Sequence, residues 1–300
     1  MTPAVSAAVD MLRAGRLVAF PTETVYGLGA DASNADALRR VFVVKGRPTD
    51  HPLIVHLGPA VPVEPWALLS PVACRLAEAF WPGPLTLIVA RGPRVNDIAT
   101  GGRASVGVRV PAHPLAIELL DAFGGGVAAP SANRFGRVSP TTADHVRADL
   151  GGDVDLVLDG GPCAVGIEST IVDCTGDRPS VLRPGGIDTE DITALVGPLA
   201  DPTGPSRAPG MLPRHYAPRA TVEIVERRNE ADRRAAELRD KGRRVAVEVL
   251  DADVTSARRL YAALRDHDAA AVDTVVVVLP PDHGLGHALR DRLQKAAARP

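Results

Sequence analysis

Apolar positions before Gly197 form short uninterrupted runs and, between these runs, stretches with helical spacing. Short apolar runs bounded by turn residues predict buried strands, whereas apolar residues three and four positions apart predict helices. The pattern predicts strands at 17–20, 53–57, 85–90, 106–110, 127–129, 156–158, 170–173 and 180–182. It predicts helices at 3–14, 35–45, 72–80 and 113–123, and two shorter helices capped by Thr141 and Thr189. Because the strands alternate irregularly with the helices, the pattern favours a mixed α/β or α+β sheet over a purely parallel one.

The end of the chain has a more regular pattern. Strands are predicted at 222–225, 244–249 and 274–279, and they alternate with helices at 231–241, 256–267 and 285–298. This order predicts a small three-layer domain with a parallel sheet. The residues before it are rich in proline and glycine and lack periodicity, so they predict a linker that carries Arg207, Arg214, His215 and Tyr216. We therefore divide the chain into a first domain at 1–198, a linker at 199–219 and a small domain at 220–300.

Composition narrows the class of protein. Aromatic residues make up only 3% of the chain, so aliphatic side chains must build the core. The net charge of −2 argues against non-specific nucleic-acid binding through overall charge, and leaves a local basic groove open. Cys74, Cys163 and Cys174 lack C-x-x-C spacing and fit buried thiols in a reducing compartment. Asp10 and Arg13 interrupt the apolar N-terminus and no long uncharged apolar run follows, so we expect a cytoplasmic protein without a membrane partner.

Hydroxyl and basic side chains gather at the ends of predicted strands. Thr22 and Thr24 follow the first strand, and a Lys-Gly-Arg-Pro turn ends the helix at 35–45. Lys45 is the only lysine before Lys241 in an arginine-rich chain, which suggests a compact ammonium that meets a phosphate. The other strand-end candidates are Arg47, Arg109, Ser131, Asn133, Ser169 and Arg183. Such residues suit a site for an anionic ligand.

Each of these residues also has a purely structural interpretation. Thr22 and Thr24 fit a strand edge, His56 fits a buried core, and Lys45 and Arg47 fit solvated cations at a helix C-terminus. Ser131 and Asn133 fit a turn, and His283 and His287 lack a third ligand nearby, so no metal site is predicted. The chain has neither a G-x-S-x-G elbow nor a P-loop, so no covalent nucleophile is indicated. The site suits the positioning of anionic reactants, as in nucleotidyl transfer.

The ordered motifs of the chain resemble a known family. They are PTETVYGLGADA, KGRP, HPLIVHL, WPGPLTLIV, VGVRVP, APSAN, DGG, ESTIVD, LRPG and, in the linker, APGMLPRHYAP. Together they resemble the YrdC-type threonylcarbamoyl-AMP synthases, in the two-domain form with a C-terminal extension. The resemblance implies a twisted mixed-sheet domain with a concave site, followed by a small Rossmann-like domain. It also implies the synthesis of L-threonylcarbamoyladenylate from L-threonine, bicarbonate and ATP, with release of pyrophosphate. A separate transferase would then modify tRNA.

The resemblance also implies roles for single residues. Lys45 and Arg47 would clamp the triphosphate and act as the catalytic pair. The expected L-threonine contacts are Thr24, His56, Arg109, Ala129 (through its backbone) and Ser169. The expected nucleotide contacts are Lys45, Arg47, His51, Ser105, Ser131, Asn133, Ser139, Arg183 and Tyr216. Mg²⁺ would arrive with the ATP phosphates, without a protein metal cage. The linker would act as a lid through Tyr216.

Two alternatives differ in class. A non-catalytic RNA-binding module would hold backbone phosphates with Arg47, Arg109, Arg183 and Arg214, but stacking aromatic residues are scarce here. A related carbamoyl-transfer enzyme of hydrogenase maturation would carry acylphosphatase-like or zinc-finger segments, which this sequence lacks. A weak direct contact with tRNA is left open.

Overall fold

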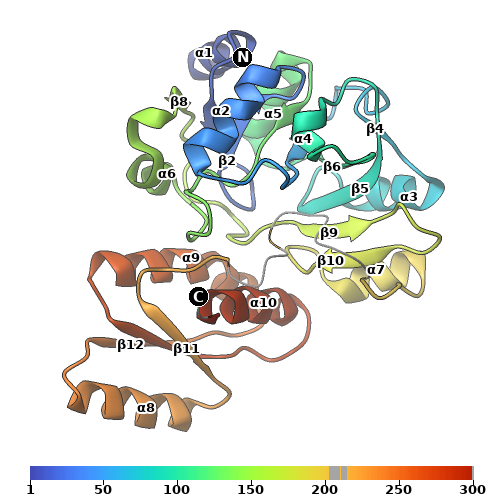
Figure 1. Ribbon diagram of the computed structural model, residues 1–300. Helices are drawn as coiled ribbons and strands as arrows, with labels where there is room; N and C mark the ends of the chain where they lie inside the picture. Colours follow the sequence, from blue (N-terminus) through green and yellow to red (C-terminus); the bar gives the residue numbers. More distant parts are fainter. Residues whose placement is uncertain (203–209, 211–214, 299–300) are drawn as a thin grey trace.

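The computed structural model describes residues 1–202, Gly210 and residues 215–298, which form a large and a small α/β domain (Figure 1). Arg207 and Arg214 of the linker lie outside the described residues. Among the described residues, every helix is too short or too polar to cross a lipid bilayer. The mixed α/β class expected from the sequence is confirmed.

The large domain is built on a mixed sheet of ten described strands. The strands are β1 (Val18–Phe20), β2 (Gly27–Asp31), β3 (Ile54–His56), β4 (Ala67–Leu68), β5 (Leu85–Arg91), β6 (Ser105–Arg109), β7 (Val127–Ala128), β8 (Leu156–Val157), β9 (Thr170–Asp173) and β10 (Ser180–Arg183). Their order is β10-β9-β5-β6-β3-β7-β2-β1-β8, and β4 pairs with β5. The β1–β8, β3–β6 and β5–β9 pairs are parallel and the others are antiparallel.

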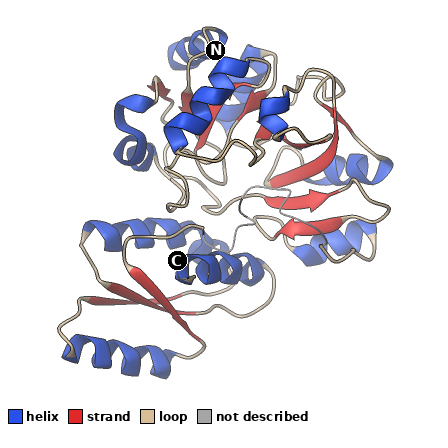
Figure 2. Cartoon of the chain, in the orientation of Figure 1, coloured by secondary structure: helices blue, strands red, loops and turns tan. Residues whose placement is uncertain are grey.

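Helices cover this sheet, as Figure 2 shows. They are α1 (Pro3–Arg13), α2 (Ala35–Lys45), α3 (Pro71–Phe80), α4 (Asp97–Thr100), α5 (Pro114–Phe123), α6 (Ala143–Leu150) and α7 (Thr189–Val196), with a 3₁₀ turn at Gly151–Asp153. Asn34 caps α2 by accepting from the backbone N–H groups of Asp36 and Ala37, and Gly46 ends it with a φ of 64°. This left-handed residue turns the chain between Lys45 and Arg47.

Two predicted helix caps are wrong by one residue. Thr142, and not Thr141, caps α6, because its hydroxyl accepts from the backbone N–H of His145. Thr141 is turned inward instead, and its backbone N–H donates to His145 Nδ1 at 3.2 Å. Asp188 precedes α7, whereas Thr189 is the first helical residue. Adjacent polar residues offer equivalent caps on sequence grounds, so only the local packing decides between them.

The small domain has the predicted alternating architecture. Its strands are β11 (Thr221–Val225), β12 (Val245–Val249) and β13 (Thr274–Val278), all parallel in the order β11-β13-β12. Its helices are α8 (Arg228–Asp240), α9 (Val254–Ala269) and α10 (Leu285–Ala297). Alternate residues of β13 pack on α8 and on the α9 and α10 layer, which faces the large domain (Figure 1). The sheet is therefore covered on both faces, as parallel sheets usually are.

The two domains share polar and apolar contacts. Arg265 of α9 pairs with Asp149 of α6, and His287 of α10 pairs with Glu190 of α7. Ile167 and Val25 of the large domain belong to the same apolar cluster as the buried faces of α9 and α10. The interface therefore contains a continuous core as well as ion pairs.

Candidate active site

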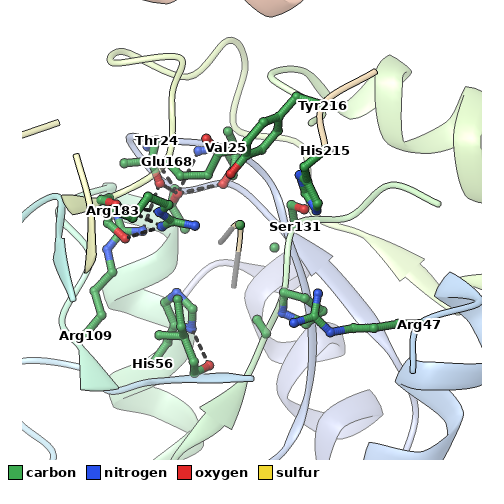
Figure 3. A pocket seen from close by; sticks show the side chains of 17 residues that line it. Thr24, Val25, Arg47, His56, Arg109, Ser131, Glu168, Arg183, His215 and Tyr216 are labelled. Atoms are coloured by element: carbon green, nitrogen blue, oxygen red, sulfur yellow. Dashed lines mark hydrogen bonds between the residues drawn. The ribbon is translucent and has the colours of Figure 1, made fainter. Parts of the chain in front are cut away.

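One pocket brings together most of the predicted site residues from distant parts of the chain (Figure 3). It is bordered by the loop after β1, the strands β3 and β6, the turn after β7, the start of β9, the end of β10 and the described part of the linker. The predicted residues that line it are Thr24, Arg47, His56, Arg109, Ala129, Ser131, Ser169, Arg183 and Tyr216. The other lining residues are Thr22, Val25, Gly27, Ile54, Pro130, Glu168, Gly210 and His215.

Strand register brings the pocket residues together. His56 of β3 lies opposite Arg109 of the parallel strand β6, and opposite Val127 of the antiparallel strand β7. The chain then leaves β7 through Ala129, whose backbone N–H donates to the carbonyl of Ile54 at 2.9 Å. Strands β3 and β6 therefore end side by side, next to the residue at which β7 begins.

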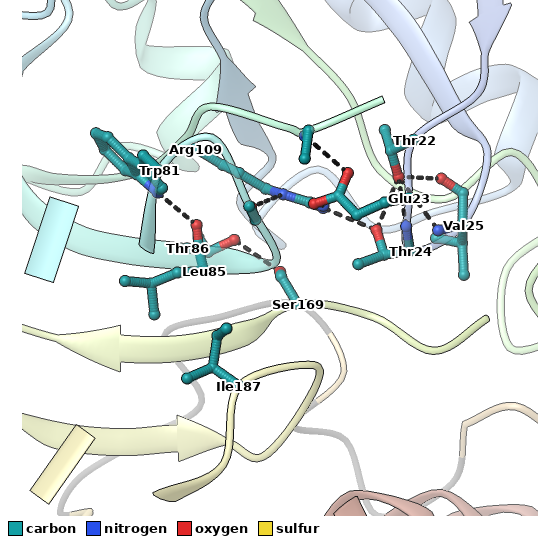
Figure 4. Close-up of polar contacts among 12 residues, drawn as sticks. Thr22, Glu23, Thr24, Val25, Trp81, Leu85, Thr86, Arg109, Ser169 and Ile187 are labelled. Carbon is teal, nitrogen blue, oxygen red and sulfur yellow. Dashed lines mark hydrogen bonds and ion pairs between the residues drawn. The ribbon is translucent and has the colours of Figure 1, made fainter. Parts of the chain in front are cut away.

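Arg109 is held in a buried network of polar groups (Figure 4). Its Nη2 donates to Glu23 Oε1 at 2.6 Å, its Nη1 to Thr24 Oγ1 at 2.9 Å and its Nε to the carbonyl of Gly83 at 3.2 Å. The other carboxylate oxygen of Glu23 accepts from the backbone N–H of Ala112. This network fixes the guanidinium plane, which is the geometry that bidentate carboxylate binding requires.

His56 is a neutral pocket residue. Its Nδ1 lies 3.1 Å from the carbonyl of Ile54, and its ring packs edge-on against Phe20. Burial, together with the nearby charge of Arg109, lowers the pKa of His56 to about 3. The imidazole is therefore uncharged at neutral pH, and its Nδ1–H donates to the carbonyl oxygen. It supplies shape and polarity to the pocket without adding a charge.

Arg183 and Ser169 form a second fixed arginine site. Arg183 Nη2 donates to the carbonyl of Ser169 at 2.9 Å and to Ser169 Oγ at 3.2 Å. Ser169 Oγ also lies 2.7 Å from Thr86 Oγ1 (Figure 4). Burial lowers the pKa of Arg183 from its usual value, yet a guanidinium stays protonated in proteins. The pocket therefore contains a second permanent cation, which is contributed by the β9–β10 strand pair.

Arg47 is the third buried cation of the pocket. It donates through Nη2 to the carbonyl of Pro52 at 3.0 Å, and its guanidinium lies 5.9 Å from the centre of the Phe135 ring. Burial lowers the pKa of Arg47 to about 10, so it remains charged at neutral pH. The ring of His51 also packs on Phe135, but His51 does not line the pocket. Arg47 is thus the residue of the KGRP turn that reaches the pocket.

Lys45 is buried beside the pocket and does not line it. Its Nζ donates to the carbonyls of Ser131 and Asn133. Asn133 Nδ2 in turn donates to the carbonyls of Arg134 and Arg137, at 2.8 and 2.9 Å. Burial lowers the pKa of Lys45 well below its usual value, and the charge of Arg47 adds to this effect. In this structure, Lys45 and Asn133 hold the loop that presents Ser131.

Two further predicted residues lie outside the pocket lining. Ser105, at the start of β6, lines a small neighbouring cavity with Ile54, Arg103 and other residues. Ser139 donates through Oγ to Glu168 Oε1 at 2.6 Å, so it contacts the pocket through another side chain. The nucleotide contacts expected for Ser105, Ser139 and His51 therefore stay predictions.

The linker side of the pocket is aromatic. Tyr216 is buried, and its ring packs against the ring of His215, 4.2 Å between centroids. Burial lowers the pKa of His215 to about 3 and raises that of Tyr216 to about 12. Both side chains are therefore neutral at physiological pH, and they lie on the linker side of the pocket, above Ser131 and Arg47 in Figure 3. The expectation that this segment moves as a lid stays a prediction.

Comparison with known proteins gives matches over both domains. A family model described as "Telomere recombination", the Sua5, YciO and YrdC family, matches residues 10–185. A second model, "Threonylcarbamoyl-AMP synthase, C-terminal domain", matches residues 187–298. The threonylcarbamoyl-AMP synthase of Pyrococcus abyssi is 40% identical, over 97% of this chain and 93% of that protein. The one from Bacillus subtilis is 42% identical, over 98% of this chain and 93% of that protein.

The chain belongs to the two-domain, Sua5-type threonylcarbamoyl-AMP synthases.

A solved structure supports the same assignment. The crystal structure of P. abyssi Sua5 complexed with L-threonine superposes with a TM-score of 0.91 at 39% identity, covering 98% of this chain and 94% of that chain. The expected enzyme class, a nucleotidyltransferase that makes threonylcarbamoyl-AMP for tRNA modification, is therefore confirmed. The full-length match also argues against both alternatives, the non-catalytic RNA-binding module and the carbamoyl-transfer enzyme.

Sequence reasoning missed several polar groups of this synthase site. Glu23 and Glu168 lie inside the motifs PTET and ESTIVD, which give them no role. An acidic residue within an otherwise hydroxylated strand-end motif is the signal that could have indicated them, because a buried arginine needs a partner. The linker pattern indicates His215 as a residue that can contact a ligand but gives it no specific role, although it adjoins the predicted Tyr216.

Proposed function

We propose that the pocket binds L-threonine beside Arg109, and the phosphates and adenosine of MgATP beside Arg47 and Arg183. The observation that carries this proposal is the convergence of three buried guanidinium groups on one pocket. Glu168 is the only acid among its described lining residues, and its oxygens already accept from Ser139, Tyr261 and Arg292. Three buried guanidinium groups favour ligands that carry anionic groups, and L-threonine and MgATP supply a carboxylate and phosphates.

The threonine end is formed by Thr24, His56, Arg109, Ser169 and the backbone of Ala129. Arg109 grips the carboxylate, because Glu23 and Thr24 already fix its guanidinium plane. The neutral ring of His56 faces the amino acid without repelling its ammonium group. The complex of P. abyssi Sua5 with L-threonine supports this choice of ligand.

The nucleotide end is formed by Arg47, Ser131, Arg183 and Tyr216. Arg47 and Arg183 neutralise the phosphates, and Tyr216 contacts the nucleotide from the linker side. Lys45 is a phosphate clamp whose Nζ would exchange the carbonyls of Ser131 and Asn133 for phosphate oxygens. His51, Ser105, Asn133 and Ser139 support this end from outside the described pocket lining.

The chemistry follows from proximity and charge. The amine of threonine attacks the carbon of bicarbonate, which loses water to give a carbamate. A carbamate oxygen then attacks the α-phosphorus of ATP, and pyrophosphate leaves. No protein nucleophile takes part, so the chain contributes by orienting anionic reactants and by stabilising the charge on the phosphoryl oxygens.

Mg²⁺ enters as part of the nucleotide. Among the described residues, no cluster of three or more His, Cys, Asp and Glu side chains could hold a metal ion. A magnesium ion that arrives with ATP needs no such cluster, because Mg²⁺ usually keeps water and phosphate ligands.

The product passes to a separate transferase that acts on tRNA, and a weak direct contact with tRNA is included in the proposal. The free thiols of Cys74, Cys163 and Cys174 fit a cytoplasmic location.

Paired binding measurements test the two ends of the pocket separately. Arg109→Ala should weaken L-threonine binding by about tenfold or more and leave the affinity for MgATP within about twofold of that of the parent protein. Calorimetric titration measures both affinities. Arg47→Ala should have the converse effect. Arg178→Ala, in the exposed turn between β9 and β10, is the matched control and should change neither. If either pocket variant, still folded, weakened both ligands equally, the division into two ends would be wrong.

A further inference from the structure

Arg292 of α10 is the most deeply buried charged group between the two domains, with 1% of its side chain exposed. Its Nε donates to Glu168 Oε2 at 2.9 Å, and its Nη1 donates to the carbonyl of Pro184 at 2.8 Å. Both partners belong to the large domain. A buried guanidinium is costly unless it is paired, so these contacts determine where α10 docks.

The carboxylate of Glu168 connects this arginine to the active site. Glu168 lines the pocket, and its oxygens also accept from Ser139 Oγ at 2.6 Å and from Tyr261 Oη at 2.8 Å. Burial alone would raise the pKa of Glu168, but the charges of Arg292 and Arg183 lower it to about 2. The pocket therefore contains a fixed anion whose main counter-ion comes from the small domain.

The same arginine also supports Tyr216. The guanidinium of Arg292 lies 5.2 Å from the centre of the Tyr216 ring, and Tyr261 of α9 stacks on that ring with centroids 5.7 Å apart. Tyr216 has a φ of 60°, a backbone conformation that is uncommon for a bulky side chain. The contacts of its ring with Arg292 and Tyr261 help to hold the residue in this conformation.

A second contact from α10 holds Gly210, which lies beside the hydroxyl group of Tyr216. Lys295 Nζ donates to the carbonyl of Gly210 at 2.7 Å. A Cβ on Gly210 would lie only 2.4 Å from Tyr216 Oη, so the backbone at this glycine passes directly over the hydroxyl. Helix α10 thus contacts both the face of the ring, through Arg292, and Gly210 beside its hydroxyl group, through Lys295.

We propose that Arg292 is a positioning residue for adenylate formation, which fixes Glu168 and the ring of Tyr216 at the nucleotide end of the pocket. The small domain is then part of the active site, although none of its described residues lines the pocket. This inference rests on the proposed assignment of Tyr216 to the nucleotide. Arg292 itself acts only through these two side chains.

Steady-state pyrophosphate release by the full chain tests the proposal. Arg292→Ala should raise the KM for ATP by about tenfold or more and leave the KM for L-threonine within about twofold. Arg292→Lys keeps a positive charge near Glu168 but loses the planar guanidinium, so it should recover part of the loss. Arg290→Ala removes an arginine from the same helix that pairs with Glu226 inside the small domain, and it should behave like the parent enzyme.

A further control separates positioning from simple domain docking. Arg258 of α9 donates to the carbonyl of Ala164 at 2.9 Å across the same interface, and this bond involves neither Glu168 nor Tyr216. Arg258→Ala should therefore leave the KM for ATP unchanged. If Arg258→Ala raised this KM as much as Arg292→Ala does, Arg292 would be an ordinary docking contact and the proposal would be wrong.

A double-mutant cycle with Tyr216→Ala identifies the route of the effect. If Arg292 acts through Tyr216, the double variant should lose little more kcat/KM for ATP than the worse single variant. Additive losses would overturn the route through Tyr216 and leave only that through Glu168, and Arg292→Lys replaces Arg292→Ala in the cycle if the alanine variant does not fold. A Tyr216→Ala enzyme with an unchanged KM for ATP would instead remove the nucleotide assignment of Tyr216. A defective Tyr216→Ala beside a normal Arg292→Ala would remove only the present inference.

Discussion

Arg109 and Glu23 form a buried ion pair at the proposed threonine end of the pocket, with Arg109 Nη2 and Glu23 Oε1 separated by 2.6 Å. Glu23 comes from the loop after β1 and Arg109 from the end of β6, so the pair joins two distant parts of the sheet. The carboxylate of Glu23 balances the charge of Arg109. The hydrogen bonds that Arg109 donates to Thr24 and to the carbonyl of Gly83 set the orientation of its guanidinium group.

Glu23→Gln should remove the charge compensation and keep the side-chain shape. We expect the free energy of unfolding to fall by about 1–3 kcal/mol, because a buried guanidinium is left without its counter-ion. We also expect a higher KM for L-threonine, since Arg109 loses orientation. Urea denaturation checks the first result and pyrophosphate release the second. Glu237→Gln, in a half-exposed pair with Arg234, is the control and should cost less than about 1 kcal/mol.

His56 should make stability depend on pH. Burial and Arg109 lower its pKa to about 3 in the folded protein, against about 6.5 in the unfolded chain. Between these values the unfolded state binds more protons, so stability is complete above about pH 6.5 and falls as the pH is lowered towards 3. A single group whose pKa is lowered in this way changes the free energy of unfolding by up to about 1.4 kcal/mol per pH unit.

The His56→Asn variant isolates this contribution. Relative to the parent protein, its loss of unfolding free energy between pH 7 and pH 5 should be smaller by about 2 kcal/mol. Urea midpoints at the two pH values measure the difference. An equal loss in both proteins would mean that His56 is not held neutral in the folded state.

Lys45→Met should loosen the loop that presents Ser131. The substitution leaves the carbonyls of Ser131 and Asn133 without their donor, so we expect a loss of about 1–3 kcal/mol in unfolding free energy. We also expect weaker MgATP binding. Lys241→Met, at an exposed lysine, should stay within about 0.5 kcal/mol of the parent protein. An undiminished stability of Lys45→Met in urea denaturation would contradict the buried contacts of Lys45.

Gly29→Ala should disturb the sheet behind the pocket. A Cβ at Gly29 would lie 2.8 Å from Val127 Cγ1 and 2.9 Å from Phe20 Cε1, and Phe20 packs edge-on against His56. We expect a loss of about 1–3 kcal/mol in unfolding free energy, measured by thermal or urea denaturation. Gly152→Ala is the control, because a Cβ there meets no atom within 4 Å. Equal stability of the two variants would contradict this packing.

Most helices and strands could be predicted from apolar spacing, since these elements bury a regular face. Strand β2 was missed because Gly27 and Gly29 have poor strand propensity. Its glycines are required by neighbours that are distant in sequence: Phe20, Val127 and Ala129 occupy the space where their side chains would lie. Local propensity cannot indicate such a contact.

Only part of the candidate site could be predicted from the sequence. His56 and Arg109 stand at the ends of β3 and β6, whose register brings them together as expected of residues at strand ends, and Thr24 lies in the loop after β1. The contacts of Glu168 with Tyr261 and Arg292 could not be predicted this way, because those partners belong to the small domain. A contact between domains leaves no periodic trace in either segment.

The most direct test of the central claim is pyrophosphate release from MgATP by the purified chain, with and without L-threonine and with and without bicarbonate. We expect release only when both co-substrates are present, because the carbamate of threonine is the group that attacks the α-phosphorus. Release without threonine, or no release from a folded protein that binds MgATP, would contradict the assignment of this pocket to threonylcarbamoyl-AMP synthesis.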